Sequence, residues 1–218
     1  MSQLLPTDPI QVVRAGPQRW EDVSTVMGRR GGSASCWCQF FRLRGTEWTG
    51  STRQANRESL RHQVCEDAIP PGLLAYLDGE PVGWCAVAPK SAYPRVVAAR
   101  GTGQALDGVW SVVCFVVRVG YRRRGVARRL IEGAVEFVRE EGGRVVEGYP
   151  VDPARRSSIS ADELYHGSLG LFTDAGFTVV SRPSKARVLV SLALDPRCPP
   201  PGPTPASDDS SPGGPAAC

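Results

Sequence analysis

Apolar and polar residues follow two different periods along the chain, and these periods predict strands in some segments and helices in others. The clearest strand is Val109–Val117, because its sequence VWSVVCFVV is rich in β-branched residues and has the length of a buried strand. The clearest helix covers 125–141, where apolar residues recur three and four positions apart until Gly142 and Gly143. Further strands are predicted at 10–15, in both arms of a hairpin around Asp78-Gly79, and at 144–151, 178–180 and 187–194; further helices are predicted at 18–27, 51–68 and 162–175.

This order of elements predicts a single α/β domain. We expect one mixed, mostly antiparallel sheet of six to seven strands, flanked by about four helices. From residue 196 onward the composition changes to Pro, Gly, Ser and Ala, with almost nothing to bury. Such a segment cannot offset the entropy lost on ordering, so we predict a folded domain over 1–195 and a disordered tail over 196–218.

Composition and charge narrow the class of protein. The chain has 218 residues, of which 41% are hydrophobic, and this is enough for one substantial core. Its net charge of +4 is small, which argues against nucleic acid as the partner. No apolar stretch reaches the roughly 18–20 residues that a membrane span needs. The first residues, MSQLLPTDPI, lack the basic and apolar regions of a secretory signal, so we expect a cytoplasmic protein with no membrane partner.

Seven cysteines are an odd count, and most lie in apolar surroundings, which favours reduced and partly buried thiols. Cys36 and Cys38 form a C-x-C pair, but no second pair of ligands follows at zinc spacing. We therefore expect no metal. A nucleophilic role for Cys36 or Cys38 would require a partner that stabilises a thiolate.

The stretch VGYRRRGVARRL, residues 119–130, lies between the predicted strand and the predicted helix. A helix N-terminus has unpaired N–H groups and a partial positive charge, so phosphates bind there. Gly125 would let a phosphate approach the backbone closely. A basic triplet on its own is more often a solvated turn, but the strand before it and the helix after it favour a phosphate site. Neither the Walker loop nor the G-x-G-x-x-G fingerprint is present.

Three motifs resemble the GNAT (Gcn5-related) N-acetyltransferase superfamily. FVVRVGYRRRGVARRLI, residues 115–131, is similar to its strand 4 and pyrophosphate loop, R/Q-x-x-G-x-G/A, with Arg122, Gly125 and Ala127 in the defining places. LGLFTDAGF, residues 169–177, resembles its C-terminal helix and Gly-Phe pair, and the hairpin LLAYLDGEPVGWCAVAP resembles its strands 2 and 3.

The resemblance implies acetyl-CoA, or another acyl-CoA, as the donor and a sheet that splays between strands 4 and 5. It places the pyrophosphate on the loop amides and the pantetheine arm along strand 4. The donor-binding residues that it implies are Phe115, Val116, Val117, Arg122, Arg123, Arg124, Gly125, Val126 and Ala127.

Similar enzymes transfer the acetyl group by direct attack of an amine in a ternary complex. Many carry a tyrosine as the acid four residues before the glycine of the Gly-Phe pair, but this chain has Phe172 there. We predict Glu147 as a water-assisted base and Tyr165 as the acid for the thiolate. The alternative is that both residues are structural. A second hypothesis for the function, favoured by Phe172, is a CoA-binding sensor or interaction module without catalysis.

The segment 33–45, SASCWCQFFRLRG, is unusually rich in Cys, Trp and Phe for a loop. In similar proteins this region belongs to the acceptor wall, so we predict Cys36, Trp37 and Phe40 as substrate contacts. The alternative is a hydrophobic cluster that only packs beneath the loop. The sequence leaves open whether the acceptor is a small-molecule amine or a protein amino group, and whether the protein is a monomer or a homodimer.

Overall fold

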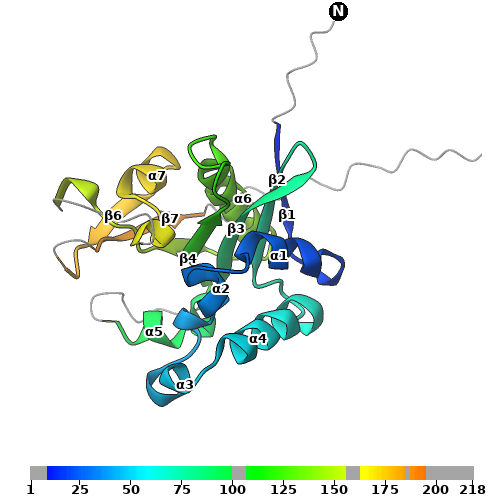
Figure 1. Ribbon diagram of the computed structural model, residues 1–218. Helices are drawn as coiled ribbons and strands as arrows, with labels where there is room; N and C mark the ends of the chain where they lie inside the picture. The colour runs from blue at the N-terminus through cyan, green and yellow to red at the C-terminus, as the bar shows by residue number, and fades with distance from the viewer. Residues whose placement is uncertain (1–8, 100–106, 156–162, 185–186, 195–218) are drawn as a thin grey trace, which may run out of the picture.

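The computed structural model describes residues 9–99, 107–155, 163–184 and 187–194. The tail predicted over 196–218 and the domain boundary at 195 lie outside these residues. The described residues form one sheet with helices packed on both of its faces (Figure 1).

Within the described part of the chain, seven strands form the sheet in the order β1-β2-β3-β4-β5-β7-β6. Among the described strands, β4 and β5 pair in parallel, and the other neighbouring pairs are antiparallel. The mixed, mostly antiparallel sheet predicted from the sequence is therefore confirmed. The strands are β1 (Ile10–Arg14), β2 (Gly72–Leu77), β3 (Glu80–Pro89), β4 (Val109–Val117), β5 (Val145–Gly148), β6 (Thr178–Ser181) and β7 (Leu189–Ala193).

The helices predicted from the sequence correspond to α1 (Trp20–Met27), α4 (Arg53–Glu66), α6 (Val126–Glu140) and α7 (Leu169–Asp174). The described residues add three short helices, α2 (Gly32–Cys36), α3 (Gly45–Thr49) and α5 (Pro94–Val97). The predicted helix over 162–175 is wrong in its extent. Gly167 has a φ of +77° and Ser168 caps α7, so the segment divides into a 3₁₀ turn, η5 (Glu163–His166), and α7.

Two hydrophobic cores lie on opposite faces of the sheet. One core packs α6 and α7 against the sheet, and the other packs α1, α4 and the segment around α2 against the opposite face (Figure 1). Gly83 allows α6 to approach β3 closely, because a Cβ atom there would lie 2.6 Å from Cγ1 of Val126. The apolar face predicted for the helix over 125–141 is the face of α6 that is buried against the sheet.

β4 and β5 are paired only over the first four residues of β4, Val109–Val112. The register of β4 against β3 shifts at the same point: Val87 pairs with Val112 and Ala86 with Cys114, so Val113 is an extra residue in β4. Such a bulge bends a strand and interrupts its pairing. Beyond Val113 the two central strands part, which is the splay that the family resemblance implies.

A methyl group at Gly148, the last residue of β5, is expected to destabilise the fold. A Cβ atom at this position would lie 2.1 Å from Cε1 of Phe172, which is fully buried. We expect Gly148→Ala to lower the free energy of unfolding by about 1–3 kcal/mol through overpacking. Urea denaturation measures this change. Gly170→Ala, with nothing within 4 Å of its Cβ position, is the control. Equal stability of the two variants would contradict this packing.

Candidate active site

The loop between β4 and α6 presents backbone N–H groups to solvent at a helix N-terminus. Gly125 is the N-cap residue of α6 and has a φ of +84°, a conformation that disfavours any side chain. No side chain caps this end of the helix, and its first turn holds no acidic residue. The positive end of the helix dipole is therefore available to an anion from outside the chain.

The three consecutive arginines of this loop make different contacts. Nε of Arg122 donates a hydrogen bond to the carbonyl of Val117 at 3.2 Å, which ties the loop to the end of β4. Arg124 lies instead over the ring of Tyr121, 5.7 Å from its centroid. Arg122 and Arg123 line the adjoining cleft, whereas Arg124 is not among its lining residues.

A cleft of about 1090 Å³ begins at this loop, follows the parted end of β4 and continues toward α3. Its walls come from four parts of the chain: the end of α1 with the following loop, the segment from α2 to α3, the region from β4 to α6, and the residues around η5. The sequence-predicted residues that line it are Phe115, Val116, Val117, Arg122, Arg123, Gly125, Val126, Ala127, Cys36, Phe40 and Tyr165. The strand, the loop and the aromatic segment thus meet in one cavity.

Trp37 lies apart from this cleft. Its side chain is buried and stacks on Trp20 with a centroid distance of 5.9 Å, and Arg57 lies over both rings. Cys38, its neighbour, does line the cleft. Trp37 therefore packs inside the protein beneath this segment and does not line the cleft. The sequence alone could not distinguish such a buried ring from a substrate contact.

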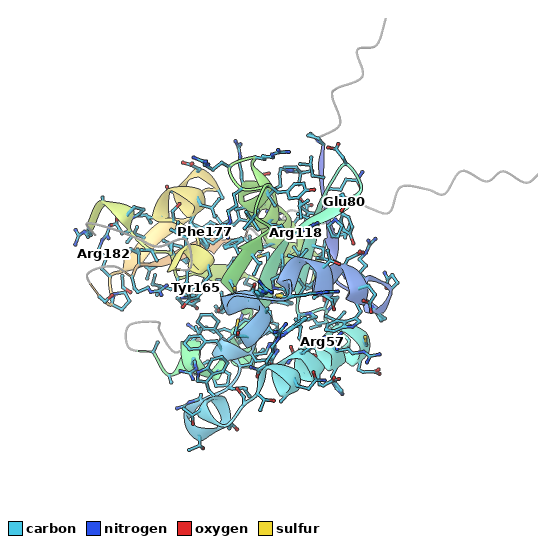
Figure 2. The ribbon with its side chains drawn as sticks, in the orientation of Figure 1. Arg57, Glu80, Arg118, Tyr165, Phe177 and Arg182 are labelled. Atoms are coloured by element: carbon cyan, nitrogen blue, oxygen red, sulfur yellow. The ribbon has the colours of Figure 1, made fainter. Side chains whose placement is uncertain are left out.

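Tyr165 lies between the sheet and the segment that carries α2 (Figure 2). Its ring packs against His166, with centroids 4.2 Å apart, and against Phe41. His166 is buried and forms a hydrogen bond with the backbone of Val113, the bulge residue. Burial, with the charge of Arg187, holds the pKa of His166 well below its ordinary value, so the imidazole is neutral. No sequence motif indicates this contact between η5 and the bulge.

Glu147 is not among the residues that line the cleft. Its Oε2 atom lies 2.9 Å from Nζ of Lys90, which is fully buried, and accepts a 2.7 Å hydrogen bond from the Tyr149 hydroxyl. The Tyr149 hydroxyl is 2.9 Å from Oγ of Ser111. Burial and the neighbouring Glu147 charge raise the pKa of Tyr149, so Tyr149 keeps its proton and donates a hydrogen bond to the carboxylate. Tyr149 is the residue after β5, so it lies outside the strand that was predicted to include it, but its hydrogen bond places it beside Glu147.

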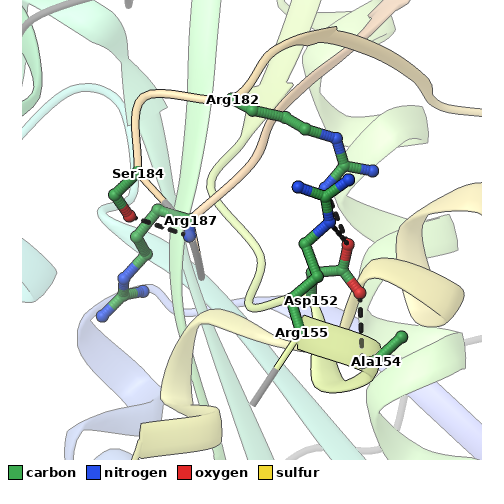
Figure 3. Close-up of polar contacts among 6 residues, drawn as sticks. All are labelled: Asp152, Ala154, Arg155, Arg182, Ser184 and Arg187. Atoms are coloured by element: carbon green, nitrogen blue, oxygen red, sulfur yellow. Dashed lines mark hydrogen bonds and ion pairs between the residues drawn. The ribbon is translucent and has the colours of Figure 1, made fainter.

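Asp152, just beyond β5, is held by arginines (Figure 3). Its Oδ2 atom lies 2.7 Å from Nη1 of Arg182 and 3.7 Å from Nε of Arg155, and its Oδ1 accepts from the Ala154 amide. The hydrogen bond from Arg182 holds the pKa of Asp152 below its ordinary value. This carboxylate therefore stays ionised and fastens the chain after β5 to the segment after β6.

Phe172 occupies the position at which many similar enzymes have a tyrosine. Its ring is fully buried and packs against Phe115 and Phe177, with centroids 6.0 and 5.1 Å away. It can neither donate a proton nor reach the cleft, whose lining residues do not include it.

Comparison with known proteins agrees with this geometry. Residues 37–161, more than half of the chain, match the model of the acetyltransferase (GNAT) family. The chain belongs to this family. No curated protein gives a significant match.

The GNAT fold is also found among solved structures. The GNAT domain of PAT from S. lividans shares 17% identity, with a TM-score of 0.53, covering 85% of this chain and 90% of that one. A GCN5-related N-acetyltransferase from Kribbella flavida also shares 17% identity, with a TM-score of 0.50, covering 85% and 98%. A putative acetyltransferase from Salmonella typhimurium, yncA, solved with its cofactor acetyl-CoA, shares 14% identity, with a TM-score of 0.48 and coverage of 89% and 99%.

Within the described ranges, no group of three or more His, Cys, Asp or Glu side chains is arranged to hold a metal ion. No helix in the same ranges combines the length and the apolar character needed to cross a bilayer.

Proposed function

We propose that this GNAT protein transfers an acetyl group from acetyl-CoA to an amine by direct attack in a ternary complex. The observation that carries the proposal is the single cleft that joins the N-terminus of α6 to the parted end of β4. In this proposal the pyrophosphate lies on the amides of 122–127, with Arg122 and Arg123 beside it.

The pantetheine arm would run along Phe115, Val116 and Val117, whose side facing β5 is left without a strand partner in the described chain. An extended, amide-bearing arm can pair with such an edge as an added strand would. The thioester would then lie near the Val113 bulge, beside Tyr165 and the thiols of the α2 segment.

In the reaction, a neutral amine attacks the thioester carbonyl and the tetrahedral intermediate expels the CoA thiolate. We propose Tyr165 as the acid that protonates this thiolate, since it lines the cleft. Glu147 remains our prediction for the base. Because its carboxylate accepts from Lys90 and Tyr149 away from the cleft, it would have to act through intervening water.

The acceptor would enter between the aromatic segment and η5, where Phe40, Phe41 and Trp48 line the cleft. All five charged residues in the described lining are arginines: Arg30, Arg118, Arg122, Arg123 and Arg128. These walls suit an amine attached to an apolar body better than a polycation. A small-molecule amine and a protein amino group both remain compatible with them.

The second candidate is a CoA-binding module without catalysis, and the burial of Phe172 favours it, since the family's usual acid is missing.

One experiment distinguishes the enzyme from the module. Purified protein is incubated with acetyl-CoA and a panel of amines, and free CoA and acetylated products are detected by thiol assay and mass spectrometry. Release of CoA with an acetylated amine supports the enzyme, whereas CoA binding without turnover on any amine supports the module.

Tyr165→Phe is expected to lower kcat by about 10²-fold or more while leaving the KM for acetyl-CoA nearly unchanged, because only the proton for the leaving thiolate is lost. The measurement is the initial rate with the best acceptor from the panel. Tyr121→Phe is the matched control, since Tyr121 packs beneath Arg118 and Arg124 and does not line the cleft. Equal rates in the two variants would rule out Tyr165 as the acid.

A further inference from the structure

Three thiols line the cleft where β4 parts from β5, and the acetyl-transfer proposal gives them no role. Cys36 and Cys38 come from the end of α2 and the residues after it, and Cys114 follows the bulge residue in β4. All three are free thiols. Sequence spacing could not bring Cys114 to this group, because its position depends on how the α2 segment packs over β4.

Cys38 is the thiol whose surroundings favour the charged form. Its Sγ atom accepts a 3.2 Å hydrogen bond from Nε1 of Trp84, and it accepts a second hydrogen bond from the Cys114 thiol. The hydrogen bond from Cys114 has the largest effect on the pKa of Cys38 and lowers it; burial opposes this, and Trp84 and the charge of Arg42 lower it further. These are the thiolate-stabilising partners that a nucleophilic cysteine requires.

The other two thiols are poorer nucleophiles. Donation to Cys38, together with burial, raises the pKa of Cys114, and burial raises the pKa of Cys36 to about 12. A thiol–disulfide exchange begins with attack by a thiolate, so Cys38 is the sulfur of this group that would react first.

The backbone also fixes the place of Cys38. Trp37 and Cys38 have successive φ values of +45° and +56°, in the left-handed region that residues with side chains rarely adopt. The stack of Trp37 on Trp20 holds one of these residues, and the bond from Trp84 holds the other. Unfavourable conformations maintained in this way occur preferentially at functional sites.

We propose that Cys38 is a modification site that undergoes thiol–disulfide exchange with the disulfide of coenzyme A. This inference rests on the proposed function, because the loop 122–127 would dock one nucleotide of the reagent and direct its sulfur along β4. The Cys38 sulfur attacks one sulfur of the disulfide. A Cys38–CoA disulfide forms, the S–S bond of the reagent breaks, and the second CoA leaves as a thiolate that takes from solvent the proton Cys38 released. The adduct would occupy the acetyl-CoA path and stop transfer until a thiol reduces it.

The test uses the full chain, reduced and freed of reductant. It is incubated with CoA disulfide or, separately, with glutathione disulfide at equal concentration, and adducts are followed by whole-protein mass and located by peptide mapping. We expect CoA on Cys38, removable by dithiothreitol, and formed at least about tenfold faster than the glutathione adduct because docking raises the local concentration. Cys65→Ser, on α4 and outside the cleft lining, should react as the unaltered chain does. Gly125→Glu should slow the CoA reaction to the glutathione rate.

Four results would overturn the proposal: no adduct, an adduct on another cysteine in place of Cys38, equal rates with the two disulfides, or an unchanged rate in Gly125→Glu. Peptide mapping of the unaltered chain identifies the sulfur even where a Cys38→Ser variant does not fold. CoA binding to the reduced chain is measured in parallel by calorimetry. Normal binding without a Cys38 adduct removes this inference alone, whereas absence of binding removes the proposed function with it.

Discussion

Replacing Gly125 with glutamate is expected to weaken CoA binding by at least about 100-fold, which corresponds to roughly 2.8 kcal/mol. The new carboxylate would stand at the positive end of α6, where the proposed pyrophosphate lies, and would repel it. The substitution also forces a side chain into a φ of +84°. Isothermal titration of the purified variant with CoA measures the change.

Gly120→Glu separates these two effects. Gly120 belongs to the same loop, has a φ of +93° and has open space around its Cβ position, but it is not among the residues that line the cleft. The same charge and a similar backbone cost are therefore introduced away from the proposed phosphate. Affinity near that of the unaltered chain is expected for Gly120→Glu, and equal losses in the two variants would reject the loop as the CoA site.

Glu147→Ala is expected to lower the free energy of unfolding by about 3–5 kcal/mol, because it removes the carboxylate that lies against the fully buried Lys90 ammonium. Chemical denaturation followed by tryptophan fluorescence gives the value. Glu140→Ala is the control, since Glu140 pairs with Arg14 at the surface, where both side chains are more than 40% exposed. Such a pair contributes about 1 kcal/mol or less, so equal losses in the two variants would contradict a buried Lys90–Glu147 pair.

A substitution closer in shape at the same position tests the predicted base. Glu147→Gln keeps the shape of the side chain and an oxygen that can accept from Lys90 and Tyr149. If Glu147 takes the proton of the amine, this variant loses rate mainly at the lower pH values, where less of the amine is neutral and the base matters most. The pH–rate profile per folded molecule is the readout, and an unchanged profile assigns Glu147 to structure alone.

Strands and long helices were predictable because their patterns are local. The run Val109–Val117 matches β4 at both ends, and α6 differs from its predicted range by one residue at each end. The three short helices could not be predicted, because α2, α3 and α5 have only four or five residues each, fewer than a periodic pattern needs. The prediction of one helix over 162–175 was wrong because the apolar pattern continues across Gly167 and Ser168, where the backbone turns.

In the candidate site, too, the features with a local sequence pattern could be predicted and the others could not. The proposed phosphate loop follows a continuous motif, so its position at the α6 N-terminus could be anticipated from sequence. The environment of a single side chain could not, because it depends on distant partners. Lys90, which neutralises Glu147, and Trp84, which donates to Cys38, are far from them in the chain. The residues next to Trp37 in the sequence do not indicate whether its ring is buried in the core or lines a cleft.

The two cores support different halves of the proposed site. The loop that would hold the donor is anchored by the core of α6, whereas the aromatic and thiol side chains on the opposite face are anchored by the core of α1 and α4. Substitutions distant from one another usually have additive effects on stability. Substitutions in segment 25–48 and in the loop 122–127 are therefore expected to change the free energy of unfolding by amounts that add.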